Sequence, residues 1–253
     1  MLVPYGVVGG GPPGVEMSGQ IPELARPALP GSFRNIDPRT TRVVLLDFAP
    51  TVLTSFGERL SDKAVEHLRR IDVEVQLNTM VVGMDRDGID VRDADGTLRR
   101  IPAFCKIWAA GVAASPLGAQ LAMQTGAELD RAGRIKVNED LSLPGHPEIH
   151  VLGDMISLHD YPGVAQVAIQ GARHVAKTLK GKPAKPFVYK DKCPIATVSR
   201  FNAVASIKGL RFYGFLPWLL WLPILLVSIV GLQRPLPTLP PWPVRVVRHR
   251  PPR

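Results

Sequence analysis

The sequence predicts an α/β fold, because short apolar segments alternate with segments of helical periodicity and the first apolar segment runs into a glycine-rich loop. The apolar segments end in Gly, Asp or small residues, as strands of a buried parallel sheet do. The chain of 253 residues is long enough for one large domain or two modest ones. The predicted strands are Tyr5–Val8, Arg42–Asp47, Val73–Gln76, Ile107–Ala109 and Ile149–Leu152.

Two other segments complete this part of the fold. Asp62–Arg70 carries Ala64, Val65 and Leu68 at helical spacing, which predicts a helix between the second and third strands. The segment Val81–Ile101 differs, because an Asp-Ala-Asp-Gly turn at 93–96 separates two short apolar runs. This pattern predicts a small antiparallel β ribbon beside the α/β unit.

Charge is divided unequally along the chain, whose formal net charge is +9. Residues 1–172 hold 16 Lys and Arg against 21 Asp and Glu, whereas residues 173–253 hold 15 against one. A basic C-terminal third indicates an anionic partner, either nucleic acid or phospholipid headgroups. Because no regular Cys/His spacing, aromatic RNA-binding signature or basic helix leading into a zipper accompanies the charge, the sequence argues against nucleic acid.

The segment Phe212–Leu232 has no charged residue over about the length needed to cross a bilayer core, and it predicts a membrane-associated helical segment. Pro217 and Pro223 lie inside it, so a spanning helix, an interfacial helix broken at proline and a buried core helix all stay open. Trp218 and Trp221 suit the headgroup boundary. The tail beyond it, predicted to be disordered and attracted to anionic lipid, contains Arg245, Arg248, Arg250 and Arg253.

The two cysteines, Cys105 and Cys193, are far apart and form no CxxC pair. This spacing argues against a disulfide framework, a zinc site and a dithiol redox centre. Two separate free thiols are therefore expected.

The glycine-rich loop is the first motif that carries chemistry. Gly9, Gly11 and Gly14 match G-x-G-x-x-G after an apolar strand and before the helix-like stretch Val15–Leu24. Glycines let the backbone approach a diphosphate at a helix N-terminus, and Asp47, which closes the next strand, would accept a hydrogen bond from the adenosine ribose. Asp47 would repel the 2′-phosphate of NADPH. The motif predicts a Rossmann-like NADH-binding domain over residues 1–110, with an ordinary glycine turn as the alternative, since Asp47 follows Gly14 by 33 residues instead of about 20.

A second motif is the strand Ile149–Leu152, which ends in Gly153–Asp154. A carboxylate at the end of a strand can meet the ribityl hydroxyls of a flavin, although this ending is more often only a turn. The helix-like run that opens with Ala165–Gln170 follows at a suitable spacing. Together these signals favour part of an FAD-binding domain over residues 111–185, followed by a membrane-associated C-terminal region over residues 186–253.

These motifs, in this order, resemble the type II NADH dehydrogenases, single-chain flavoenzymes of the membrane surface that pass electrons from NADH through FAD to quinone. The resemblance extends from about Tyr5 to Leu232. It rests on VVGGGPPGVEMSGQI at 7–21, LLDFAPTVL at 45–53, WAAGV at 108–112, IHVLGDM at 149–155, AQVAIQ at 165–170, and YKDK with ATVSRFNAVA between 189 and 205.

The resemblance implies roles for individual residues. The positions implied to bind cofactors are Gly9, Gly11, Gly14 and Asp47 for NADH, Gly153 and Asp154 for FAD, and Gly111, Ala165 and Gln166 as further cofactor contacts. Gln166 and Gln170 are implied to lie against the isoalloxazine and the quinone pocket.

Glu16 and Lys192 match a carboxylate and an ammonium near that quinone pocket. Such a pair would keep each other charged and could relay protons during quinone reduction. A carboxylate near a helix start and a solvated lysine are the alternative reading.

As partners and location, the resemblance implies membrane quinone, an anionic phospholipid bilayer and the cytoplasmic face of the cell membrane. A homodimer stays an open alternative. The implied activity is that of a non-electrogenic NADH:quinone oxidoreductase.

The chain also departs from the family pattern. The family has an FAD-binding segment before its NADH domain, and this segment is expected to be missing here. Pro22, Pro27 and Pro30 are expected to break or shorten the helix after the glycine loop. A truncated, non-catalytic remnant that binds NADH and membrane but not FAD is therefore the alternative function. A pyridine nucleotide-disulfide reductase is a further alternative, which the absent CxxC disfavours.

Overall fold

The structure is a computed structural model that describes residues 4–35, 37–191, 194–207 and 209–228. The chain forms two compact units, and each is described by itself. The first comprises Met1–Gly111 and Cys193–Arg253, and the second comprises Val112–Lys192.

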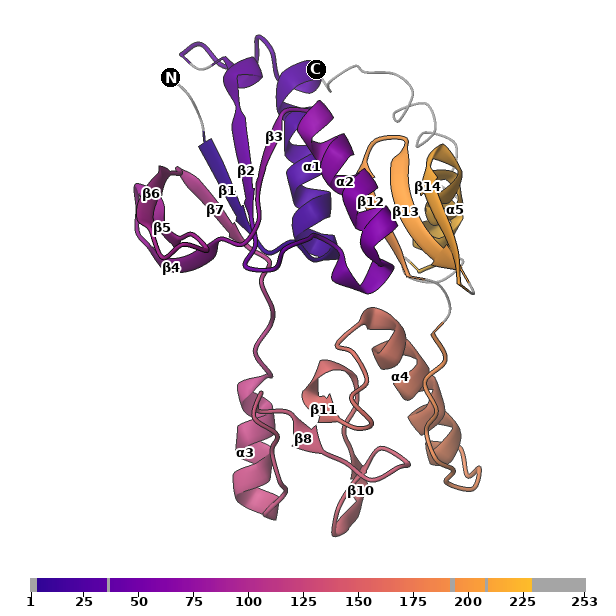
Figure 1. The fold of residues 1–253 in the computed structure, drawn as a ribbon. Coiled ribbons are helices and arrows are strands. Elements are labelled where there is room, and N and C mark those ends of the chain that lie inside the picture. Colours follow the sequence, from indigo (N-terminus) through magenta and orange to yellow (C-terminus); the bar gives the residue numbers. More distant parts are fainter. Residues whose placement is uncertain (1–3, 36, 192–193, 208, 229–253) are drawn as a thin grey trace. The chain divides into compact units, whose positions relative to one another are not determined.

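The first unit is built on a four-stranded parallel sheet with the strand order β3-β2-β1-β7 (Figure 1). Alternate residues of each strand point to opposite faces of the sheet. Val7 and Leu45 therefore pack against the helices α1 and α2, whereas Val8 and Leu46 face the small antiparallel sheet. The bounds are β1 Pro4–Val8, β2 Arg42–Leu46, β3 Val73–Gln76, β7 Cys105–Trp108, α1 Pro12–Ala28 and α2 Glu58–Arg70.

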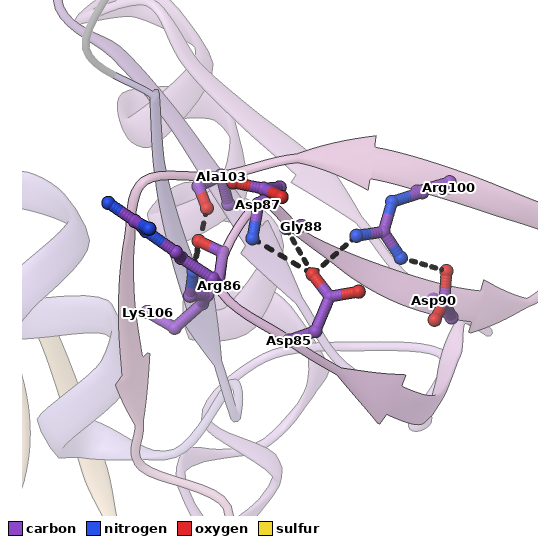
Figure 2. Close-up of polar contacts among 8 residues, drawn as sticks. All are labelled: Asp85, Arg86, Asp87, Gly88, Asp90, Arg100, Ala103 and Lys106. Carbon is purple, nitrogen blue, oxygen red and sulfur yellow. Dashed lines mark hydrogen bonds and ion pairs between the residues drawn. The ribbon is translucent and has the colours of Figure 1, made fainter.

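The small sheet is the predicted ribbon, with β4 (Met80–Met84), β5 (Gly88–Arg92) and β6 (Leu98–Pro102) in antiparallel order. Ile89, Val91 and Ile101 are buried on the side of this sheet that faces the parallel sheet. Polar contacts close its turn and attach it to β7 (Figure 2). The predicted antiparallel ribbon is confirmed.

Asp85 is the centre of that turn, because its carboxylate accepts hydrogen bonds from the backbone amides of Asp87 and Gly88 and pairs with Arg100. Arg100 also pairs with Asp90 across the sheet, at 2.9 Å. Lys106 of β7 donates to the carbonyl oxygens of Arg86 and Ala103, at 2.6 and 2.9 Å (Figure 2). These exposed ion pairs contribute little to stability one by one, but they fix the register of the turn.

The first unit also contains a C-terminal antiparallel sheet in the order β12-β13-β14, followed by the helix α5 (Figure 1). Ala196, Val198 and Val204 of this sheet belong to the same core as the helices α1 and α2. The bounds are β12 Ile195–Ser199, β13 Asn202–Ile207, β14 Leu210–Gly214 and α5 Phe215–Ser228.

The second unit has its own core, which includes Ile135, Leu141, Val167 and Phe187. Its regular elements are short apart from two helices. The bounds are α3 Pro116–Thr125, β8 Ile135–Lys136, β9 Ser142–Leu143, β10 His146–His150, β11 Ile156–Ser157 and α4 Ala165–Leu179. Short 3-10 helices occupy Pro38–Thr40 and Thr54–Phe56 in the first unit and Gly153–Met155 in the second.

The predicted buried parallel strand Ile149–Leu152 is wrong. The strand here is β10, which ends at His150 and pairs antiparallel with β9. The turn around Gly145 brings the two segments together, and the amide of Val151 then bonds to the carbonyl of Leu141 at 3.0 Å. Backbone groups of the neighbouring segment 141–143 thus provide the hydrogen-bond partners that a larger sheet would otherwise provide.

The expectation that prolines break the helix after the glycine loop is also wrong. Helix α1 continues through Pro22 and Pro27 to Ala28, and Pro30 lies beyond its end. A proline inside a helix costs about 3 kcal/mol, but α1 packs along both β2 and β12 and buries Val15 and Ala25. Burial of two faces outweighs the lost hydrogen bonds.

The C-terminal apolar segment differs from its prediction in three respects. Residues 212–214 belong to β14, and α5 passes through Pro223 without a break. Trp218 is buried against Phe201, with ring centroids 4.8 Å apart, so it does not lie at a headgroup boundary. Within the described part of the chain, no helix has the length and apolar character that crossing a membrane requires. The basic tail with Arg245 lies outside the described residues.

Candidate nucleotide site and its surroundings

The glycine loop lies at the carboxyl end of β1, between the ends of β2 and β7. The amide of Gly9 bonds to the carbonyl of Leu46 at 2.8 Å, and Gly9 has a φ of 113°, which disfavours other residues. A Cβ atom on Gly9 would lie 2.6 Å from the backbone of Ala109, and one on Gly14 would lie 1.8 Å from the carbonyl oxygen of Gly9. Close approach of another backbone segment therefore requires glycine at both positions.

Asp47 follows β2 directly and lies against this loop. Its carboxylate accepts hydrogen bonds from the amides of Gly10 and Ala49, the second at 2.6 Å. The carbonyl of Gly10 in turn accepts from the amide of Leu53 at 2.8 Å. Since a carboxylate has about four acceptor positions, Asp47 can still accept from a ligand hydroxyl. The glycine loop and Asp47, which are far apart in sequence, thus form one site.

An open cavity of ≈ 750 Å³ begins three residues beyond Asp47. It continues along α2 and combines hydroxyl, carboxylate and apolar side chains. Its lining includes Pro50, Thr51, Thr54, Asp62, Val65 and Leu77.

Glu16, in the second turn of α1, accepts a hydrogen bond from the backbone amide of Thr197 at 3.1 Å. Burial raises the pKa of Glu16, while the Thr197 bond acts in the opposite direction. Its predicted partner, Lys192, lies outside the described residues, so the Glu16–Lys192 pair stays a prediction.

Glu23 repeats this contact two turns further along α1. It accepts from the backbone amide of Arg200 at 2.6 Å, and burial raises the pKa of Glu23 as well. The two carboxylates thus bond to one amide of β12 and to the amide of the residue that follows this strand. Sequence reasoning missed Glu23, although a spacing of seven residues placed it on the same helical face as Glu16.

The raised pKa of Glu23 leads to a pH prediction. A carboxyl group whose folded pKa is raised favours folding below its ordinary value of 4.5, and this contribution is lost as the pH rises through the folded pKa. We therefore expect Glu23→Gln to gain stability relative to the unmodified chain as the pH rises from 4.5 to 8. Urea unfolding across this range measures the difference.

The matched control is Glu66→Gln on α2. Hydrogen bonds and charge from Lys63, together with Arg70, lower the pKa of Glu66, so its contribution to stability is present above the ordinary value of 4.5 and is lost only as the pH falls through the lowered pKa. Between pH 4.5 and 8, the stability of this variant should therefore run nearly parallel to that of the unmodified chain. Parallel curves for Glu23→Gln and the unmodified chain would contradict the prediction.

A third polar link joins α2 to the C-terminal sheet. His67 hydrogen-bonds to the hydroxyl of Ser199 through Nε2 and lies 2.8 Å from the Asn202 amide through Nδ1. Asn202 also donates to the Tyr213 hydroxyl at 3.0 Å. Burial, aided by the charge of Arg70, lowers the pKa of His67. Because Ser199 is buried, this group holds elements together and is not an exposed nucleophile.

In the second unit, the structure brings the two halves of the predicted flavin motif together. Gly153 has a φ of 75° and lies against Ala168 of α4, and the Asp154 carboxylate lies beside Gly163, just before the helix starts at Ala165. Asp154 is exposed, so its carboxylate can reach a ligand.

The two glutamines of α4 differ in their surroundings. The Gln170 amide bonds to both backbone groups of Lys190, at 2.9 and 3.1 Å, so its side chain is used in holding that segment. Gln166 is half-buried and has no hydrogen-bond partner among the described residues. Gln166 is therefore the better placed of the two for a ligand. Gly111, the last residue of the first unit, has a φ of 95°.

Within the described ranges, no three His, Cys, Asp or Glu side chains gather in a way that could hold a metal ion. Cys105 is a free thiol on β7. The site is thus one of backbone amides, glycines and a carboxylate, which is the chemistry of dinucleotide recognition.

The class defined by this fold and loop is that of the pyridine nucleotide oxidoreductases. The chain belongs to the pyridine nucleotide-disulphide oxidoreductase family, whose sequence profile matches residues 3–172.

Within that class, the chain is similar to type II NADH:quinone oxidoreductases, which confirms the predicted resemblance. It is 50% identical to Ndh of Mycobacterium tuberculosis over 256 residues, covering 98% of this chain and 55% of that protein. It is 31% identical to the type II NADH:quinone oxidoreductase of Staphylococcus haemolyticus, covering 82% and 52% of the two chains. The chain spans about half the length of these curated relatives.

A solved structure of NDH2 from Plasmodium falciparum in complex with NADH has the same fold. Its TM-score is 0.86 with 15% sequence identity, and the match covers 98% of this chain and 66% of that one. A reduced CoADR-RHD of Bacillus anthracis matches less closely, with a TM-score of 0.61 over 80% of this chain and 34% of that one.

Proposed function

We propose that this chain supplies the NADH site and part of the FAD site of a membrane-associated NADH:quinone oxidoreductase. The observation that carries the proposal is the contact between Asp47 and the amide of Gly10, which places a carboxylate at the mouth of a loop that excludes side chains at Gly9 and Gly14. A diphosphate fits where only backbone is present, and a ribose hydroxyl fits an anchored acceptor.

The proposal predicts selectivity between the two nicotinamide dinucleotides. Asp47 would accept from the ribose hydroxyls of NADH, whereas the 2′-phosphate of NADPH would bring a negative charge against the carboxylate. We expect the purified chain in detergent to bind NADH about tenfold or more tightly than NADPH by calorimetry. No heat with NADH would refute the NADH site, and equal affinity would refute the role of Asp47.

For FAD, the exposed Asp154 and the positive φ of Gly153, which lies against the first turn of α4, fit a contact with a ribityl chain. Gly153, Asp154, Ala165 and Gln166 would hold this part of the cofactor. FAD, when bound, would supply the hydride acceptor that links NADH to quinone.

A visible spectrum of the purified chain distinguishes this enzyme from the alternative remnant. Flavin absorbance near one equivalent supports the enzyme, whereas a folded but colourless chain that binds NADH supports the remnant. The NADH site is tested separately, by the calorimetric titration with NADH.

Glu16 is the residue that we propose for proton transfer near quinone. Its raised pKa lets the carboxyl hold a proton nearer to neutral pH than a solvated glutamate, and the Thr197 amide fixes one of its oxygens. Lys192 would stabilise the ionised form, as the resemblance implies.

The proposed membrane contact lies on α5 of the first unit. Phe215, Leu216, Leu219 and Leu220 are exposed by 56%, 55%, 47% and 41%, at spacings that place them on one side of the helix. Such an apolar face suits the interface of a bilayer, and the basic C-terminal third favours anionic lipid. The proposed location is the cytoplasmic face of the cell membrane.

The double variant Leu216→Ser and Leu220→Ser should therefore release the protein from anionic phospholipid vesicles. Flotation of the full chain with such vesicles measures the bound fraction, which we expect to fall several-fold, because each buried leucine contributes about 1.5–3 kcal/mol. Leu98→Ser, at a still more exposed leucine on β6, is the control and should float as before. Undiminished flotation of the double variant would remove α5 from the contact.

A further inference from the structure

The first turn of α1 has few amides to offer a diphosphate. A helix normally presents its first N–H groups unpaired, and these bind anions. Here the helix begins with Pro12 and Pro13, which have no N–H, and Val15 is already bonded to the carbonyl of Gly11 at 3.0 Å. Gly14 is therefore the only one of the first three helical residues with an amide to donate.

The rest of the loop adds one amide. The amide of Gly9 is bonded to Leu46, and that of Gly10 is bonded to Asp47. Among the described residues, the amides of Gly11 and Gly14 have no partner. The six residues from Gly9 to Gly14 thus leave two donors for two phosphate groups.

We propose that Pro13 sets the strength with which this chain holds the diphosphate of NADH, by placing a ring carbon where a peptide amide would donate. This inference rests on the proposed NADH site. It follows that recognition depends more on the ribose contact at Asp47 than on the diphosphate.

Pro13 is the better of the two prolines to replace. Its ring is exposed, whereas Pro12 is half-buried and occupies the first helical position, where proline favours the start of a helix. Replacing Pro13 restores one donor and removes no buried contact.

Calorimetry of the full chain in detergent tests the proposal with three ligands: NADH, ADP-ribose and adenosine. Pro13→Ala should bind NADH and ADP-ribose about tenfold more tightly, because a hydrogen bond to a charged group gains more than the freed backbone loses. Adenosine, which has no diphosphate, should bind with unchanged affinity. Pro13→Ser restores the same amide and guards against a folding defect in one variant.

Pro27→Ala is the matched control, since it removes an exposed proline from the other end of α1 and should leave all three affinities unchanged. Unchanged or weaker binding of both diphosphate ligands to the folded Pro13 variants would overturn the inference, as would an equal gain for adenosine. If the unmodified chain binds NADH and the variants bind no tighter, only this inference fails. If neither the chain nor the variants bind NADH, the proposed NADH site is refuted, and this inference is refuted with it.

Discussion

Gly19→Ala is expected to lower the free energy of unfolding by about 3 kcal/mol, near the upper end of the cost of overpacking a buried contact. The added Cβ would lie 1.7 Å from the carbonyl oxygen of Val198 and 2.8 Å from its carbonyl carbon. Both atoms are backbone, so α1 and β12 must move apart. This movement would also lengthen the hydrogen bond between Glu16 and the Thr197 amide.

Urea unfolding of the full chain measures this loss. The matched control is Gly118→Ala in α3, where the nearest atom to an added Cβ lies 3.5 Å away. Alanine there should be neutral or gain up to about 1 kcal/mol from helix propensity. If Gly19→Ala unfolds at the same urea concentration as the unmodified chain, α1 and β12 are not in the close contact described above.

Asp47→Ala is expected to weaken NADH binding by about tenfold to one hundredfold. The variant loses the ribose acceptor and also leaves the amides of Gly10 and Ala49 without their present partner. Asp47→Asn separates two effects, because it keeps an acceptor oxygen but removes the charge, so its preference for NADH over NADPH should shrink.

Calorimetry with both dinucleotides measures these changes. Asp87→Ala, at an exposed carboxylate in the turn of the small sheet, is the control and should bind NADH as the unmodified chain does. Unaltered affinity in Asp47→Ala would show that the ribose is bound elsewhere.

The parallel sheet and the glycine loop could be predicted from the sequence because their signals are local. A strand that is buried on both faces is apolar throughout, and a loop that meets another backbone needs glycine at fixed positions. The same reasoning located Asp47, since the carboxyl ends of neighbouring parallel strands lie together. The structure confirms four of the five predicted strands, the ribbon and the helix that begins at Ala165.

The errors arose where tertiary contacts overrule local preference. Pro22 does not end α1, because packing on two sides stabilises the helix, and Ile149 belongs to a hairpin strand because Gly145 allows a tight turn. Trp218 could not be placed in advance, since its partner Phe201 lies in the turn between β12 and β13. The hydrogen bond from Arg200 to Glu23 depends on pairing between distant segments, which periodicity does not show.

The attachment of β12 to α1 has a consequence for motion. The helix that begins at the nucleotide loop is the same one whose carboxylates hold the Thr197 and Arg200 amides. A ligand that reduces the motion of the first turn of α1 would therefore slow the hydrogen exchange of those two amides with solvent, although they lie far from the loop in sequence. Ligand binding at one end of α1 would thus change the exchange rates of amides in β12 and just after it.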